Sequence, residues 1–339
     1  MNITILGCGT SSGVPALGCD CAVCRSDDPN NKRRRVSILV NQGDTRVLVD
    51  TSPDLRAQLL DAEITHLDAV LYTHAHADHL HGLDDLRSVN FNMDRAIDVW
   101  GREATLSIIQ ERFGYAFQPI GSWWSRPSLN AHVLSHGNAM EIGNISILPF
   151  EQIHGRAFTT GFRFGDAAYS TDVKEFSDSS FEILKGIKLW IIDCVGFQEH
   201  PTHAHLGLTL DWIAQVNPER AVLTHMSHQF DYRKLLAQLP RGVEPGFDGM
   251  ILECILALFV LLAIGSSLGF AEYKAVVWNE ANPVLGFALA AGKLVNNGLP
   301  FIPVALGTVF GILMLEGFLL TTLDSAVRLN RYLFEELFL

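Results

Sequence analysis

The sequence predicts an α/β domain over residues 1–250, followed by a hydrophobic helical segment over residues 251–339. Two observations indicate the domain: strand-like and helix-like runs alternate along it, and several of its apolar runs end directly in His or Asp. A third observation marks the boundary. The chain after residue 249 has four basic and seven acidic residues and no histidine.

The overall composition argues against a nucleic-acid partner. The 339 residues carry a formal net charge of −12, whereas a nucleic-acid-binding surface needs a basic stripe. The first residues also lack the basic start and the apolar core of a signal peptide. We therefore expect a cytoplasmic, reducing location for the domain.

Short apolar runs predict the first elements. Residues 2–6 are expected to form a buried strand, and residues 37–40 and 46–49 a hairpin. A helix over residues 53–60 follows, because a proline just inside a helix start is favourable there. Asp50 lies at the carboxyl end of the second hairpin strand, where it either hydrogen-bonds a metal ligand or caps the helix.

Three cysteines share one short window. Cys19, Cys21 and Cys24 have the spacing C-x-C-x-x-C and could occupy three corners of a tetrahedral zinc site, with one ligand coming from elsewhere. The alternative is three free cysteines in a loop. A closed site of this kind would be structural, and it would order a loop that has few apolar residues.

The densest group of potential ligands follows the apolar run at residues 69–72. It reads H-x-H-x-D-H and consists of His74, His76, Asp78 and His79. Three imidazoles and a carboxylate in six positions are hard to explain by packing. A strand that ends in this motif places side chains on both sides of a turn, where they can hold two metal ions.

Further apolar runs end in the same residue types. A structural histidine or a capping aspartate is the ordinary explanation for any one of them. Several such ends beside the H-x-H-x-D-H turn instead predict a metal site. The additional candidates are His154, Asp172, His203, His205 and His225.

In order along the chain, these residues match the ligand set of the metallo-β-lactamase fold hydrolases, which the chain resembles over residues 1–250. Within that superfamily it is similar to the phosphoribosyl cyclic phosphate phosphodiesterases of the carbon–phosphorus lyase pathway. The resemblance is most specific in residues 18–24, 223–230 and 247–250. It implies an αββα sandwich that hydrolyses a small cyclic ribose phosphodiester with water activated by two metal ions.

The resemblance also implies a role for each ligand. Imidazole and carboxylate ligands suit two divalent ions, which could be Zn, Mn or Fe. One ion would be held by three histidines, the second by one aspartate and two histidines, and a second aspartate would bridge them. In that order the ligands are His74, His76 and His154; then Asp78, His79 and His225; then Asp172.

The same resemblance implies a general acid and completes the cysteine site. His203 would protonate the leaving group. The family has a carboxylate two residues later, whereas this chain has His205, so His203 or His205 acts beside Asp78 in the predicted catalytic set. His228 would complete a structural Cys3His zinc site with the three cysteines.

A small phosphodiester is the expected partner, and a homodimer is a further expectation. Two metal ions about 3.5–4 Å apart can activate water and neutralise the phosphoryl oxygens. The alternatives are another hydrolase or a nuclease of the same fold, or a fragment of a membrane transporter fused to a hydrolase.

The tail predicts two transmembrane helices, at residues 251–270 and 299–323. Twenty apolar residues at ~1.5 Å each span roughly 30 Å, the thickness of a bilayer core. A buried globular helix is the alternative for each run, and residues 249–253 can also be interpreted as the last strand of the hydrolase domain. Residues 252–339 resemble a fragment of the carbon starvation protein family of membrane transporters, so we expect the segment to lie in the inner (cytoplasmic) membrane as part of a fusion.

Overall fold

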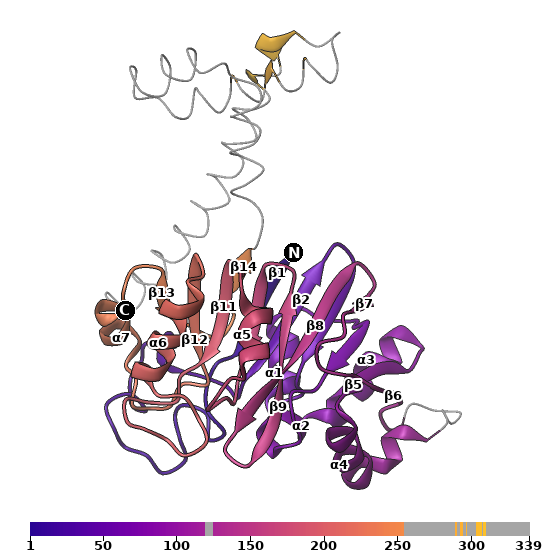
Figure 1. Cartoon of the computed structure of the whole chain (residues 1–339). Coiled ribbons are helices and arrows are strands. Elements are labelled where there is room, and N and C mark those ends of the chain that lie inside the picture. The colour runs from indigo at the N-terminus through magenta and orange to yellow at the C-terminus, as the bar shows by residue number, and fades with distance from the viewer. Residues whose placement is uncertain are drawn as a thin grey trace, which may run out of the picture. The chain divides into compact units, whose positions relative to one another are not determined.

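Two β-sheets packed face to face form the core of the domain (Figure 1). The computed structural model describes residues 1–118 and 125–253, together with a few positions between 289 and 309. The chain divides into two compact units, Met1–Cys254 and Ile255–Leu339. The α/β class predicted for the first part is confirmed by its two sheets and the helices that cover them.

The first sheet contains a hairpin followed by parallel strands. In the described chain its order is β14-β1-β2-β3-β4-β5-β6. The hairpin strands β2 and β3 are antiparallel, and β3 to β6 run parallel, so the predicted first strand and hairpin are confirmed. The strands are β1 Asn2–Gly7, β2 Ser37–Gln42, β3 Thr45–Val49, β4 Ala69–Leu71, β5 Ile97–Gly101, β6 Leu129–Val133 and β14 Ile251–Glu253.

The second sheet is antiparallel at one end and parallel at the other. Its order in the described chain is β13-β12-β11-β10-β9-β8-β7. Strands β7 to β10 are antiparallel, whereas β10 to β13 are parallel. The strands are β7 Met140–Ile142, β8 Ile145–His154, β9 Ala157–Phe164, β10 Ala167–Ser170, β11 Leu189–Asp193, β12 Arg220–Thr224 and β13 Val243–Pro245.

Helices cover the outer faces of both sheets (Figure 1). The predicted helix over 53–60 begins two residues later, at Leu55, and three short 3-10 turns interrupt the loops. The first sheet carries α1 Leu55–Asp61, α2 Ala77–Leu80, α3 Leu86–Met93 and α4 Glu103–Phe113, and the second carries α5 Asp178–Leu184, α6 Leu206–Val216 and α7 Tyr232–Gln238, with 3-10 turns at Pro29–Asn31, Leu83–Asp85 and Gly114–Phe117.

Successive side chains of the first sheet point alternately into two different hydrophobic cores. In β3, Val47 and Val49 pack into the core between the sheets, whereas Leu48 between them packs on the helical side with Leu55 of α1. Successive side chains of a strand point to opposite faces, so an apolar run of this kind fills both cores. Both faces of the strand are therefore buried, and its end is held rigidly.

The parallel strands bring segments that contain His or Asp to one edge of the sheets. Parallel strands end at the same edge of a sheet, and ligands in α/β folds bind outside those carboxyl ends. Here β3 and β4 of the first sheet and β10, β11 and β12 of the second each end in a segment that contains His or Asp. The site forms where these segments meet.

The predicted first transmembrane helix is wrong at its start. Residues 251–253 form β14, which pairs antiparallel with β1 and places Leu252 opposite Ile3. Leu252 is fully buried, because it fills the core of the domain. The rest of that prediction, and most of the second predicted helix at 299–323, lie outside the described residues. Within the described part of the chain, none of the helices has the length and hydrophobicity that a membrane crossing requires.

Candidate metal centre

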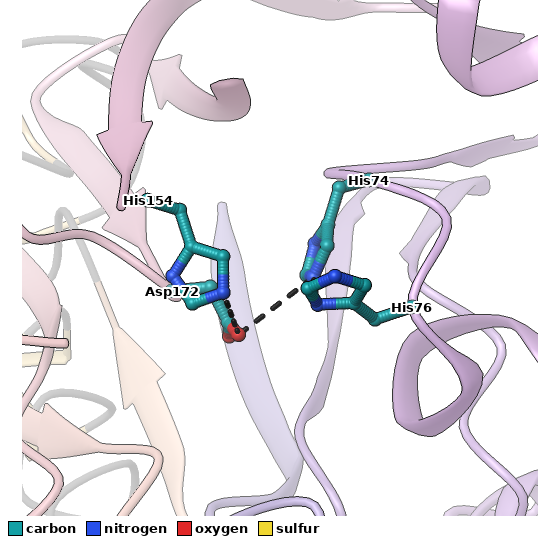
Figure 2. Close-up of side chains that lie close together, drawn as sticks. All are labelled: His74, His76, His154 and Asp172. Carbon is teal, nitrogen blue, oxygen red and sulfur yellow. Dashed lines mark hydrogen bonds and ion pairs between the residues drawn. The ribbon is translucent and has the colours of Figure 1, made fainter. Parts of the chain in front are cut away.

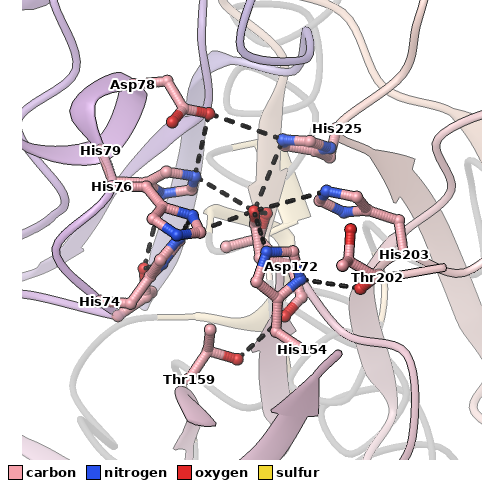
Figure 3. Close-up of polar contacts among 12 residues, drawn as sticks. His74, His76, Asp78, His79, His154, Thr159, Asp172, Thr202, His203 and His225 are labelled. Atoms are coloured by element: carbon pink, nitrogen blue, oxygen red, sulfur yellow. Dashed lines mark hydrogen bonds and ion pairs between the residues drawn. The ribbon is translucent and has the colours of Figure 1, made fainter. Parts of the chain in front are cut away.

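Imidazole and carboxylate groups from both sheets converge at this edge (Figure 2, Figure 3). Within each group the potential ligand atoms lie no more than 4.8 Å apart. One group consists of His74, His76, His154 and Asp172, a second of Asp78, His79 and His225, and a third of Asp172, His203 and His225. The structure thus brings together all seven residues that were predicted to hold the two catalytic metals.

Asp172 lies between the two halves of the cluster. Its Oδ1 is 3.1 Å from Nε2 of His79 and 3.5 Å from Nε2 of His225. Its Oδ2 is 3.7 Å from Nε2 of His74 and 3.8 Å from Nε2 of His154. Each carboxylate oxygen therefore faces a different group of histidines, which is the arrangement that a bridging carboxylate needs.

The turn after β4 distributes its four side chains. His74 follows the buried end of the strand, and the extended backbone of His76 (φ −71°, ψ 154°) forms the N-cap of α2. Asp78 and His79 are consecutive residues in the first turn of that helix, so their side chains point in different directions from the helix axis. The motif reaches both halves of the cluster because it spans the turn between β4, which ends at Leu71, and α2, which begins at Ala77.

Three residues at strand ends have left-handed backbone conformations. Asp50, Asp172 and His225 have φ values of 63°, 53° and 55°, and they follow β3, β10 and β12. This region is costly for residues other than glycine and is found preferentially at functional sites. In each case the turn directs the side chain back across the sheet edge into the cluster.

Asp50 orients His79. Its Oδ2 is 2.7 Å from Nδ1 of His79, and its two oxygens accept hydrogen bonds from the backbone N–H (2.8 Å) and the hydroxyl (2.7 Å) of Thr73. Of the two predicted roles for Asp50, the hydrogen bond to a ligand is the one that the structure shows. A carboxylate that holds one ring nitrogen of a histidine presents the other to a metal.

Asp193 was missing from the predicted set. It is fully buried at the end of β11, where its Oδ2 lies 3.0 Å from Nδ1 of His203 and accepts a hydrogen bond from the backbone N–H of Val173. Its Oδ1 is 3.6 Å from Nδ1 of His225. The signal in the sequence was an apolar run ending in Asp, which a simple capping residue would also produce.

The structure distinguishes between the two candidate acids. Nε2 of His203 is 3.9 Å from Asp172, and the His203 ring stacks on that of His225 with centroids 4.5 Å apart. His205 is instead the N-cap residue of α6, outside the groups of clustered ligands described above. His203 therefore faces the cluster and His205 does not.

Neighbouring charges in the cluster shift the pKa values of its histidines and of Asp172. Burial alone would lower the pKa of His79, but the neighbouring carboxylates, Asp172 first, hold it well above its usual value. Burial would raise the pKa of Asp172, but the histidines around it, His225 first, hold it well below the usual range. Burial and the adjacent His79 together lower the pKa of His74. The lowered pKa favours the ionised form of Asp172, whose negative charge compensates positive charge placed beside it.

The donor set fits metal ions. Nε2 of His79 and both ring nitrogens of His225 are buried without a hydrogen-bond partner in the described chain, although buried polar atoms are almost always paired. Nδ1 of His154 is held 2.7 Å from the carbonyl oxygen of Thr202, which leaves its other nitrogen directed at the cluster. A histidine that binds a metal usually has one ring nitrogen in a hydrogen bond and the other directed at the metal.

The cysteine loop forms a second cluster of ligands. Sγ of Cys19, Sγ of Cys24 and a ring nitrogen of His228 lie within 4.8 Å of one another. Cys21 falls outside that group, but its Sγ accepts a hydrogen bond of 3.4 Å from the backbone N–H of Cys24. The structure therefore brings His228, predicted from a distant part of the chain, to the cysteine loop.

Comparison with known proteins identifies similar chains. A family model described as a β-lactamase superfamily domain matches residues 45–226. A solved structure of a diphosphatase from the PhnP family is 36% identical with a TM-score of 0.70, and the match covers 75% of this chain and 98% of that one. Zinc-bound PqqB from Methylobacterium extorquens shares the fold, with a TM-score of 0.61 and 18% identity over 75% of this chain and all of that one (100%).

A curated relative carries a different name. A protein of Porphyromonas gingivalis named octanoyltransferase is 36% identical over 253 residues, which cover 74% of this chain. The match covers 51% of that protein. The chain therefore spans about half the length of this curated relative.

Proposed function

The chain belongs to the β-lactamase superfamily and is a metal-binding hydrolase, and from that premise we propose that it cleaves a small phosphodiester. The observation that supports this most directly is the position of Asp172 between two groups of histidines. Two divalent ions bound there, Zn, Mn or Fe, would supply the Lewis acidity that activates water and neutralises phosphoryl oxygens. One would be held by His74, His76 and His154, the other by Asp78, His79 and His225, with Asp172 shared.

His203 completes the reaction as the general acid. Its Nδ1–H donates to the buried carboxylate of Asp193, which fixes the ring and leaves Nε2 directed at the cluster. A protonated Nε2 can donate its proton to the departing alkoxide oxygen, because an alkoxide is a poor leaving group without it. The carboxyl group of Asp193, 3.0 Å from Nδ1, would stabilise the imidazolium before the transfer.

A small cyclic ribose phosphodiester is the proposed substrate. The similarity to a diphosphatase of the PhnP family supports phosphoryl chemistry, and the net charge of −12 disfavours a long nucleic acid. The name octanoyltransferase belongs to a protein of which about half lies outside the match. The cluster itself consists of His and Asp, which suit metal-assisted hydrolysis, whereas acyl transfer through an enzyme-bound intermediate needs a nucleophile such as Cys or Lys.

The other ligand cluster is proposed to bind one structural zinc ion through Cys19, Cys21, Cys24 and His228. The homodimer, the membrane-bound tail and the resemblance of the tail to transporters stay predictions.

Activity of the metal-loaded full chain on a generic aryl phosphodiester tests the proposal. We expect release of p-nitrophenol from bis(p-nitrophenyl) phosphate and loss of at least about 10²-fold in kcat with Asp172→Asn, because the charge shared between both halves of the cluster is removed. Circular dichroism checks that the variant is folded. Asp166→Asn, an exposed aspartate paired with Lys188, is the matched control and should leave the rate unchanged.

A second outcome of the same assay would contradict the proposal. A chain that binds two metal ions per molecule and cleaves neither aryl, alkyl nor cyclic phosphodiesters would refute the proposal.

A further inference from the structure

The backbone of Asp172 is strained, and the residues that hold it lie outside the set of candidate ligands. Asp172 follows β10 with a φ of 53° and is buried. A conformation of this kind persists only where the surrounding structure holds it in place. Because the two oxygens of Asp172 face different groups of histidines, a rotation of its backbone would move the carboxylate relative to both groups.

Two buried threonines hold Asp172. The hydroxyl of Thr171 donates to Oδ1 of Asp172 at 2.8 Å, and the hydroxyl of Thr159 on β9 donates to its carbonyl oxygen at 2.9 Å (Figure 3). Both threonines are fully buried, so these hydrogen bonds form in a low dielectric, where they are stronger than in water. Thr171 therefore holds the side chain of Asp172, and Thr159 holds its backbone.

A buried glutamine on β8 links the two threonines. Nε2 of Gln152 donates to Oγ1 of Thr159 at 3.1 Å and to the carbonyl oxygen of Thr171 at 2.9 Å. Gln152 and Thr159 are opposite each other in the β8–β9 ladder, so their side chains lie on the same face of the sheet. The backbone carbonyl groups of Thr171 and Asp172 are thus held by two side chains that contact each other.

The direction of these hydrogen bonds follows from the chemistry of the groups. The carbonyl oxygen of Thr171 can only accept, so the NH2 group of Gln152 must face it. The second N–H of that group is then available to Oγ1 of Thr159, whose single proton is left for the carbonyl oxygen of Asp172. Gln152, Thr159 and Asp172 therefore form a hydrogen-bond relay in which each donated bond strengthens the next.

The amide of Gln152 is retained although its oxygen has an unfavourable environment. Oε1 is buried without a hydrogen-bond partner in the described part of the chain, and a buried unpaired acceptor destabilises a protein. A Cβ atom at Gly161 on β9 would lie only 2.5 Å from Oε1, so the strand has a glycine where the amide needs space. The two N–H donors of Gln152, and not its packing, explain an amide at this position.

We propose that Gln152 and Thr159 are positioning residues of the metal centre, which hold Asp172 in the conformation that lets its carboxylate face both metal ions. They would act only through Asp172. This inference rests on the proposed two-metal function and extends it to the residues that support the shared carboxylate. Loss of the relay should weaken the binding of both ions, by roughly the 10- to 100-fold that is typical when a group that orients a metal ligand is removed.

Metal binding by two Thr159 variants tests the relay. The metal-free full-length chain is titrated with Co²⁺ against a chromophoric chelator, and the visible spectrum of the bound cobalt is recorded. Cobalt at the cysteine cluster is recognised by its thiolate absorption and is left out of the comparison. Thr159→Val replaces the hydroxyl with a methyl group, so it should lower cobalt affinity by about 10- to 100-fold and change the spectrum. Thr159→Ser keeps the hydroxyl and should bind cobalt as wild type does.

Variants of Gln152 test the direction of the relay. In Gln152→Glu, a carboxyl oxygen takes the place of Nε2 and would accept the proton of the Thr159 hydroxyl, which would then be lost to Asp172. We expect this variant to bind cobalt as weakly as Thr159→Val. Gln152→Met removes both N–H donors, and its effect should be less than additive with that of Thr159→Val because the two residues act through one hydrogen bond.

Thr105→Val provides the matched control. Thr105 is a buried threonine on α4, outside the relay and the candidate ligands, so cobalt binding should not change. Wild-type affinity and spectrum in Thr159→Val would overturn the proposal. So would equal losses in Thr159→Val and Thr159→Ser, since the hydroxyl would then be irrelevant. Circular dichroism checks folding, and if Thr159→Val does not fold, the same comparison of Gln152→Met with wild type decides.

Cobalt binding does not require turnover, so failure of this inference is distinguishable from failure of the proposed function. Weaker cobalt binding by Thr159→Val supports the relay even if wild type cleaves no phosphodiester. Unchanged cobalt binding by Thr159→Val refutes the relay even if wild type cleaves bis(p-nitrophenyl) phosphate.

Discussion

Asp193 contacts two histidines with one carboxylate. Its Oδ2 fixes the proposed acid His203, and its Oδ1 lies 3.6 Å from the proposed metal ligand His225. The rings of the two histidines are stacked, so a change in either would be transmitted to the other. The proposed proton donor and one proposed metal ligand therefore share one buried carboxyl group.

The effect of the leaving group on the rate should show whether His203 is the general acid. We expect His203→Ala to lower kcat by about 10²- to 10⁴-fold for an alkyl phosphodiester. The loss should be much smaller for bis(p-nitrophenyl) phosphate, because nitrophenolate departs without a proton. The two rates are measured by ³¹P NMR and by absorbance. His205→Ala should affect neither rate; if it reproduces the His203→Ala pattern instead, the assignment of the acid is wrong.

Asp248 should make stability depend on pH. It accepts hydrogen bonds from the backbone N–H groups of Cys8 and Arg34, and burial raises its pKa from 3.8 to about 6. A carboxyl whose pKa is higher in the folded state contributes stability below about pH 4 and loses it as the pH rises through about 6. The loss amounts to roughly 3 kcal/mol for a shift of about two units.

Asp248→Asn isolates this contribution. Urea unfolding of wild type and variant is compared at pH 4, 5, 6 and 7. The free energy of unfolding of wild type relative to the variant should fall across that range, because the amide does not titrate. A difference between the two proteins that stays constant with pH would contradict the assignment.

At the scale of elements, the cysteine loop depends on a histidine from the other end of the domain. His228 follows β12, and the buried Arg33 links the same two regions by hydrogen bonds to the carbonyl oxygens of Ser227 and Phe230. The long loop between β1 and β2 contains few apolar residues of its own. Hydrogen bonds to the segment after β12 contribute to its order.

Removal of His228 should therefore loosen that loop. We expect His228→Ala to release one equivalent of zinc and to lower Tm by about 5–10 °C, the shift that roughly 2–3 kcal/mol produces in a domain of this size. Metal analysis and thermal unfolding check this. His132→Ala, a half-buried histidine on β6 paired with Asp98, should do neither. Unchanged zinc content in His228→Ala would exclude the histidine as a ligand.

The helices and strands were predictable where a local pattern of apolar residues determines them. The strands that carry the site are short apolar runs, and the helix at Glu103–Phe113 buries Thr105, Leu106 and Ile109 at helical spacing. The choice of partner for Asp50 was not predictable, because a carboxylate at a strand end has the same sequence whether it caps a helix or holds His79. His203 and His205 are two positions apart in one loop, and only tertiary contacts separate them.

At the scale of the whole molecule, β14 sets the boundary of the domain. The sequence of residues 249–253 fits either the last strand of the domain or the start of a long apolar helix, because Ile251 and Leu252 lead into the hydrophobic tail. Pairing with β1 decides for the strand, since it buries Met250 and Leu252 in the core. A local apolar run does not show which distant strand it pairs with, so the sequence alone could not decide between these two interpretations.

Two truncations should locate the boundary. A chain ending at Cys254 should unfold with the same free energy as the domain in the full chain. A chain ending at Gly249 should lose roughly 3–6 kcal/mol, because two large apolar side chains are no longer buried. Denaturant titration followed by tryptophan fluorescence measures both. Equal stability of the two truncated chains would show that β14 is dispensable.

The pairing of β14 with β1 makes the two ends of the domain neighbours, with Asn2 opposite Glu253. Proteins with adjacent ends commonly tolerate circular permutation. A short linker from Glu253 to Asn2, with new ends in the turn at Gly165, would keep every side chain of the metal centre in place. The spatial arrangement of the candidate ligands therefore does not require the order in which they occur along the sequence, because the two sheets would hold the same side chains at the same edge.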